Sequence, residues 1–140
     1  MKADETQYPK NVTKRIVGVV FALLPLALTF SSMAVAITRP QHTHLVSITI
    51  IVAAALIAAL NFYLSFIRGL LFSLRHGSLD AYRFVSGAPI IGTLLMVLGV
   101  ALDFGAVGIA LAGTVAYVLD TGSSLWFVIA TWKDRSLWDA

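Results

Sequence analysis

The chain contains no cysteine and little charge. Without thiols it cannot form disulfides, thiolate metal sites or thiol nucleophiles. Charged residues make up 12% of its 140 residues, whereas a soluble domain carries about 25%. Hydrophobic residues make up 59%, and so short a chain has a large surface for its volume. Because water alone cannot solvate so apolar a surface, the composition predicts a protein that is covered by lipid.

Side chains that commonly carry catalysis or hold cofactors are also scarce. The chain has 3 histidines, and all fall in predicted loops, at His42, His44 and His76. A haem between helices needs histidines inside facing spans, and a serine hydrolase needs its base at the depth of its nucleophile. The pair His42 and His44 falls short of the three or four ligands of a metal site. We therefore expect no enzyme activity, no metal and no cofactor.

Four apolar runs are long enough to cross a bilayer as helices, which takes about 20 residues. They cover residues 16–37, 45–67, 85–102 and 107–129. We expect an all-α integral membrane protein, with residues 1–140 forming a single membrane domain. Its four transmembrane helices are expected to form an antiparallel bundle, up-down-up-down, with a cytoplasmic loop over residues 68–84.

Two of these runs show features of helix geometry. Pro25 lies inside the first run and is expected to bend it, with Thr29 near enough to bond a freed backbone group. The helix of the second run is expected to continue past the bilayer surface and to end at Gly77, a favourable residue just after a helix. Arg75 and His76 would then lie at its negative end.

The distribution of lysine and arginine predicts the orientation of the bundle. Basic residues precede the first run, follow the fourth, and occur between the second and third as Arg68, Arg75 and Arg83. On the opposite side lies only Arg39, which is near enough to Asp103 to pair with it. We therefore expect the protein in a bacterial inner membrane, with both termini in the cytoplasm. We expect no nucleic-acid partner. The basic residues gather at the ends of apolar runs, which is why the net charge of +3 does not indicate nucleic-acid binding.

The first run also admits another interpretation. A basic segment, an apolar core and the small residues 34–36 have the order of a cleaved signal peptide. The apolar stretch is longer than such a core requires, which favours a span. The rest of the topology is the same under both interpretations.

Asp120 is the charged residue inside the predicted spans. A carboxylate at the centre of a bilayer costs about 2.5–3.5 kcal/mol on insertion scales, so we expect it to face protein. Counting about 1.5 Å per residue from the outer ends of the second and fourth helices puts Asn61 within about one turn of Asp120. Asp120, Asn61 and Ser124 are the candidate intramembrane polar site. It is either a proton or cation site, or a structural carboxylate bonded to a neighbour.

Small residues recur every four positions in the fourth run, at Gly108, Ala112 and Ala116. Such spacing lets two helix backbones approach closely. The three residues are the candidate helix-packing face. Gly92 and Gly99 in the third run are expected to be packing positions as well.

Two functions remain open. The first is a non-catalytic protein-binding role: small bacterial immunity proteins that neutralise membrane-inserting toxins resemble the chain in size and layout, as do accessory subunits of larger complexes. The second is a homo-oligomer that moves a small solute, driven by protons through Asp120. Small four-helix multidrug exporters have a similar mass but place their essential acid in the first span, which has none here. We favour the first, with the lipid bilayer and either another membrane protein or a second copy as partners.

Overall fold

The computed structural model describes residues 11–78, 82–83, 85 and 87–138, and all regular elements among them are helices. In chain order they are α1 (Val12–Thr38), α2 (Leu45–Phe62), the π-helical η1 (Tyr63–Ile67), α3 (Arg68–His76), α4 (Ile91–Leu102), α5 (Val107–Leu119), α6 (Ser124–Thr131) and α7 (Arg135–Trp138). The all-α prediction is confirmed over this part of the chain.

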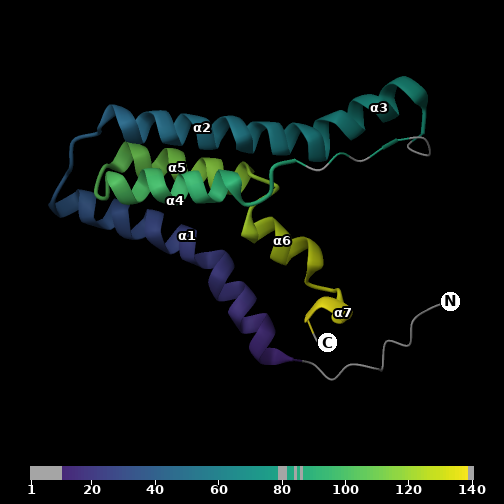
Figure 1. The fold of residues 1–140 in the computed structure, drawn as a ribbon, viewed down its shortest axis with the longest axis horizontal. Helices are drawn as coiled ribbons and strands as arrows, with labels where there is room; N and C mark the ends of the chain where they lie inside the picture. Colours follow the sequence, from purple (N-terminus) through teal and green to yellow (C-terminus); the bar gives the residue numbers. More distant parts are fainter. Residues whose placement is uncertain (1–10, 79–81, 84, 86, 139–140) are drawn as a thin grey trace.

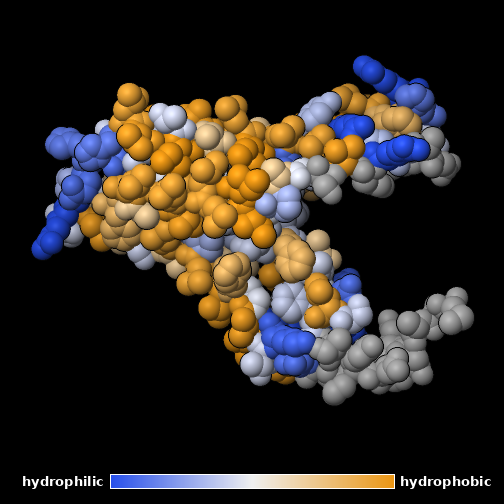
Figure 2. Space-filling view, in the orientation of Figure 1, coloured by the Kyte–Doolittle hydropathy of each residue, from blue (hydrophilic) through white to orange (hydrophobic). Residues whose placement is uncertain are grey.

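Three of the described helical stretches are long and apolar enough to cross a membrane. They are Val12–Thr38, Leu45–His76 and Val107–Thr131. The helix α4 is apolar but has 12 residues, which is shorter than a crossing by helix alone requires. Figure 2 shows hydrophilic residues gathered at the two ends of the molecule and hydrophobic residues over the surface between them.

The helices α1 and α2 lie on either side of α4 and α5 (Figure 1). The turn after α1 and the turn between α4 and α5 meet at one end, where the Gln41 N–H donates to the carbonyl of Gly105 over 3.2 Å. At the other end the chain divides: α3 points away from the first half of α1, beside which α6 and α7 lie (Figure 1).

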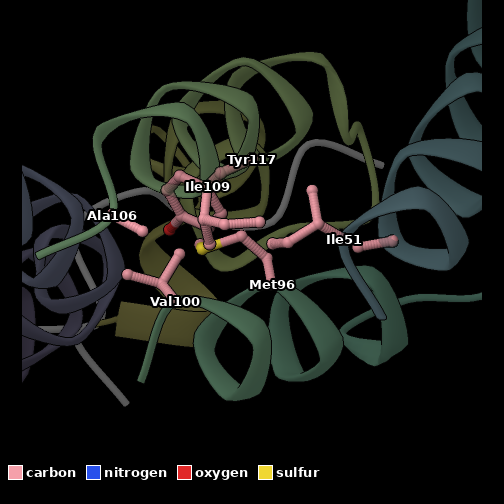
Figure 3. Close-up of a cluster of buried hydrophobic side chains, with 7 residues drawn as sticks. Ile51, Met96, Val100, Ala106, Ile109 and Tyr117 are labelled. Atoms are coloured by element: carbon pink, nitrogen blue, oxygen red, sulfur yellow. The ribbon is translucent and has the colours of Figure 1, made fainter. Parts of the chain in front are cut away.

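The core lies in the undivided half of the molecule (Figure 3). Met96 and Val100 of α4 are fully buried there and pack with Tyr117 of α5. The buried face of α2 has a spacing of four and three residues, which keeps it on one side of a helix. Its members are Ser47, Ile51, Ala54, Ala58 and Asn61.

The helix α1 bends near Pro25 (Figure 1). A proline has no N–H and its ring displaces the preceding turn, so nearby carbonyls lose their helical partners. The Tyr117 hydroxyl donates to the carbonyl of Ala22 over 2.6 Å, and the Thr29 hydroxyl donates to that of Leu26 over 2.9 Å. The bend is therefore tied to α5 by a side chain that the sequence did not indicate.

The second long helix continues through η1 and α3 and ends at Gly77, as the sequence predicts. Gly77 has a φ of 73°, a left-handed conformation that glycine adopts without strain. The first part of the predicted cytoplasmic connection over residues 68–84 is thus helical, at Arg68–His76. The 32 residues of Leu45–His76 span about 48 Å at 1.5 Å each, longer than the hydrocarbon core of about 30 Å.

Two predicted helices are interrupted in the structure. The third was expected from residue 85, with a bend at Gly87 and Pro89, and its helix begins only at Ile91, after Ile90 with a φ of 69°. Pro89, just before it, cannot donate a helical hydrogen bond. The fourth was expected to be continuous but breaks between α5 and α6 at residues 120–123. Hydropathy did not reveal the break because apolar residues lie on both sides of it.

Within the chain, one of the three residues of the predicted packing face is buried. Gly108 and Ala112 are exposed, whereas Ala116 is buried. A helix turns about 100° per residue, so each step of four drifts by about 40° and three steps by about 120°. The face actually buried is Ile109, Ala110, Gly113, Ala116 and Tyr117. Gly92 and Gly99 of α4 are buried as expected.

Candidate intramembrane site

The interruptions of three helices meet around Asn61 and Asp120. The π-helix η1 begins two residues after Asn61, α4 is preceded by the non-helical residues 87–90, and Asp120 is the first residue of the break between α5 and α6. Single π-helical turns and broken helices are frequent at functional sites of membrane proteins. We call Asn61, Asp120, residues 87–90 and residues 120–123 the Asp120 site.

Asn61 joins two of these interruptions. Its Nδ2 donates to Asp120 Oδ1 over 2.6 Å and to the carbonyl of Ala88 over 3.2 Å. Its Oδ1 accepts from the Ala88 N–H over 2.8 Å. The amide is 2% exposed, and both of its donors and its acceptor have partners. Asn61 therefore holds the chain before α4 against the end of α5, at the depth that residue counting predicted.

Asp120 is 1% exposed and is only half satisfied. Its Oδ1 accepts from Asn61 and also from the Gly122 N–H over 2.9 Å. Its Oδ2 has no hydrogen-bond partner among the described residues, and neither has the fully buried hydroxyl of Ser123. A buried polar atom without a partner costs free energy, so an unpaired carboxylate oxygen is an unusual feature to retain.

Three glycines make room for the two side chains. A Cβ built on Gly87 would overlap Asn61 Oδ1, and one on Gly92 would overlap Asp120 Oδ2. A Cβ on Gly122 would lie 2.7 Å from Asn61 Nδ2. The close approach of three backbones to one polar pair requires the absence of these side chains.

The break after α5 is also held by backbone bonds. The Ile90 N–H donates to the Gly122 carbonyl over 2.9 Å, and the Ser123 N–H donates to the Asp120 carbonyl over 2.9 Å. Thr121 and Ser65 share a hydroxyl–hydroxyl bond of 2.8 Å. One backbone bond, from Ile90 to Gly122, thus joins the two non-helical segments directly.

No lysine, arginine or histidine of the described residues forms an ion pair with Asp120. The Arg68 guanidinium lies 5.6 Å from the centre of the Tyr82 ring. The exposed Arg75 ends α3, and Arg83 is exposed in the following segment. None of these three basic residues therefore pairs with Asp120 in the described structure.

Ser124, the third predicted site residue, belongs to a different contact. Its hydroxyl bonds the hydroxyl of Tyr117 over 2.9 Å, beside the bend of α1. The predictions missed Ala88 and the three glycines Gly87, Gly92 and Gly122. The glycine–proline spacing at residues 87–89 and the Asp-Thr-Gly-Ser sequence at residues 120–123 are typical of chain breaks and were the signal available.

A cavity of about 1050 Å³ starts at the break and extends between the first half of α1 and the helices α6 and α7. Gly122, Ser123 and Ser124 lie at its inner end, and Asn11 and Lys14 belong to the other end. We call it the α1–α6 groove. No sequence pattern indicated it, because its walls come from segments more than 100 residues apart.

At the opposite end of the molecule, Asp103 is 3% exposed and binds His44. Its Oδ2 accepts from the His44 N–H over 2.6 Å, and its Oδ1 lies 2.6 Å from His44 Nδ1. The expected pairing of Asp103 with Arg39 is therefore wrong. Burial by itself raises the pKa of Asp103, but the bonds from His44 and the attraction of its charged ring outweigh it and lower the pKa below its ordinary 3.8.

No protein-family model matches the sequence, and no curated protein or solved structure is significantly similar to it. What the protein does is therefore argued from the geometry of the site.

Proposed function

We propose that the chain is a four-span protein of a bacterial inner membrane, with both termini in the cytoplasm, which binds a proton at Asp120 and couples it to the movement of a small solute. The observation that carries the proposal is the unpaired Asp120 Oδ2, 1% exposed where three helix interruptions meet. This is the second of the two functions that the sequence left open.

The third span in this proposal is α4 together with the residues before it. The 12 residues of α4 measure about 18 Å. Residues 87–90 add up to about 13 Å, since an extended chain spans about 3.3 Å per residue. The sum is close to the hydrocarbon thickness of about 30 Å. A non-helical end is tolerable there because Asn61 and Gly122 bond its backbone.

Proton binding at Asp120 changes the bonds that hold the break. An ionised carboxylate accepts hydrogen bonds strongly, and a protonated one accepts them less well. Adding a proton therefore weakens the bonds from Asn61 and from the Gly122 N–H to Oδ1. Because the Gly122 carbonyl accepts from the Ile90 N–H, the charge of Asp120 is linked to the position of the segment before α4. This is how a proton would alter the binding of a solute.

The test is an infrared titration of the protein in liposomes. A protonated carboxyl group has a carbonyl band that an ionised one lacks, and we expect one such band to appear and vanish with pH in the native protein and to be absent in Asp120→Asn. Asp134→Asn is the control, because that carboxylate is exposed. A titration that is the same in Asp120→Asn as in the native protein would exclude proton binding at this residue.

A protein-binding role is the second candidate, and α3 is the observation that favours it. This helix extends away from the bundle (Figure 1) and exposes Leu70, Leu71 and Leu74. An immunity-type or accessory protein would use such a surface to contact another membrane protein. Crosslinking in native membranes, followed by mass spectrometry, should then place a stoichiometric partner on α3. Crosslinks from α3 to lipid alone would remove this candidate.

A further inference from the structure

The α1–α6 groove has apolar walls. Its walls include Val17, Phe21, Phe127, Val128 and Trp138. Trp138 is 7% exposed and donates its indole N–H to the carbonyl of Thr131 over 2.8 Å. Gly18 lets the Trp138 ring lie directly on α1, because a Cβ at that position would overlap the ring. The last helix thus folds back over α1 and forms one side of the groove.

The two ends of the groove differ in chemistry. At the inner end lies Ser123, whose buried hydroxyl has no partner among the described residues. At the opposite end, which we call the mouth of the groove, lies Lys14, in the first turn of α1. That turn contains no acidic residue, and the N-terminus of a helix carries a partial positive charge.

A second basic side chain, Arg15, follows Lys14 at this end, and others follow Trp132 in sequence outside the groove lining. The Arg15 guanidinium donates to the carbonyl of Trp132 over 2.9 Å and lies 5.2 Å from the centre of its ring. Lys133 and Arg135 follow in sequence. The acid among them, Asp134, accepts bonds from Ser136 and Leu137 at the start of α7. Among the described residues at this end of the groove, basic side chains therefore outnumber acidic ones, and the walls of the groove are apolar.

The geometry points to a binding site for a membrane phospholipid with an anionic headgroup. One acyl chain lies between α1 and α6 against the apolar walls, and the phosphate lies at Lys14 and the first turn of α1. The volume of about 1050 Å³ is at the upper end of the roughly 300–1,000 Å³ of small-molecule sites. The groove shares Gly122 and Ser123 with the Asp120 site, but no described contact joins Lys14 to the Asp120 carboxylate, so the headgroup does not require a proton there.

A photoreactive amino acid in place of Val128 identifies the occupant of the groove in native membranes. A lipid adduct on α6 is the expected product. An adduct to residues 1–10, to a second copy of the chain or to another protein would overturn the proposal. The same substitution at the lipid-facing Ile129, which does not line the groove, is the control for random contact with bulk lipid and should give no preference for a headgroup.

Headgroup selectivity is measured by native mass spectrometry of protein loaded from vesicles of phosphatidylglycerol or phosphatidylcholine. We expect the native protein to retain one phosphatidylglycerol in preference. Lys14→Gln should reduce this retention about fivefold, since one basic group near a membrane surface contributes about 1 kcal/mol. Lys133→Gln removes an exposed lysine outside the groove and should have a smaller effect. Equal retention of both lipids, or equal losses in the two variants, would overturn the proposal. Asp120→Asn should retain the lipid, which separates this site from the proposed function.

Discussion

Gly92 lies against a carboxylate that cannot easily move away. Asp120 is short, and its Oδ1 is held by Asn61 and by the Gly122 N–H, so a methyl group at position 92 has to displace Oδ2 or the helix itself. We expect Gly92→Ala to destabilise the protein by about 1–3 kcal/mol, as overpacking does in a dense core. The measurement is unfolding in mild detergent, followed by circular dichroism.

Gly108→Ala is the matched variant. A Cβ at Gly108 meets nothing within 4 Å, and the residue is inside α5. The replacement should leave the stability unchanged or raise it by up to about 1 kcal/mol, because alanine loses less backbone entropy in a helix than glycine does. Equal losses in the two variants would show that close packing at Gly92 is not the cause.

Asp103 predicts a pH dependence at the other end of the molecule. Its pKa in the folded protein is below the ordinary 3.8, so the unfolded chain takes up the proton first as the pH falls. The stabilisation by Asp103 is complete above the ordinary pKa and is lost as the pH falls through the folded one. The difference in melting temperature between the native protein and Asp103→Asn should therefore shrink as the pH falls below about pH 4. A constant difference at all pH values would contradict the lowered pKa.

Among the elements, the segment before α4 depends on a single side chain. Asn61→Ala removes both bonds to Ala88 and one to Asp120, and an unsatisfied buried group costs about 1–3 kcal/mol. We expect the Ala88 amide to exchange its hydrogen faster in this variant, with little change in the first turns of α2. Hydrogen exchange with mass spectrometry measures both segments in one experiment.

Ser65→Ala serves as the control for Asn61→Ala. Ser65 bonds Thr121 across the same two elements, but this pair is exposed. Its loss should leave the exchange of Ala88 unchanged. If Ser65→Ala accelerates exchange at Ala88 as much as Asn61→Ala does, the effect comes from general loosening of the site. The bonds of Asn61 would then have no specific role in holding the segment.

Hydropathy located the helices well and their interruptions poorly. It placed the turns at residues 39–44 and 103–106 because polar and glycine residues separate long apolar runs there. An average over about 20 residues cannot detect a four-residue break such as residues 120–123. Counting residues along two helices brought Asn61 near Asp120. The contact with Ala88 could not be predicted, since it depends on the path of a non-helical segment.

For the whole molecule, the proposed topology makes a prediction about which side of the membrane each end of the bundle faces. The turns after α1 and α4 are in contact, so they must face the same side, and four spans place both ends of the chain on the other.

The chain has no cysteine, so a cysteine introduced at one position is labelled without background from native cysteines. We expect an impermeant maleimide to label Thr43→Cys and Phe104→Cys on intact cells. Thr13→Cys and Lys133→Cys should react only after the membrane is permeabilised. Labelling of Thr43→Cys and Phe104→Cys from opposite sides would mean that α4 and residues 87–90 do not cross. A reactive Lys133→Cys on intact cells would instead mean that the helices after the Asp120 break fail to reach the cytoplasm, and the mouth of the α1–α6 groove would then not lie at the inner leaflet.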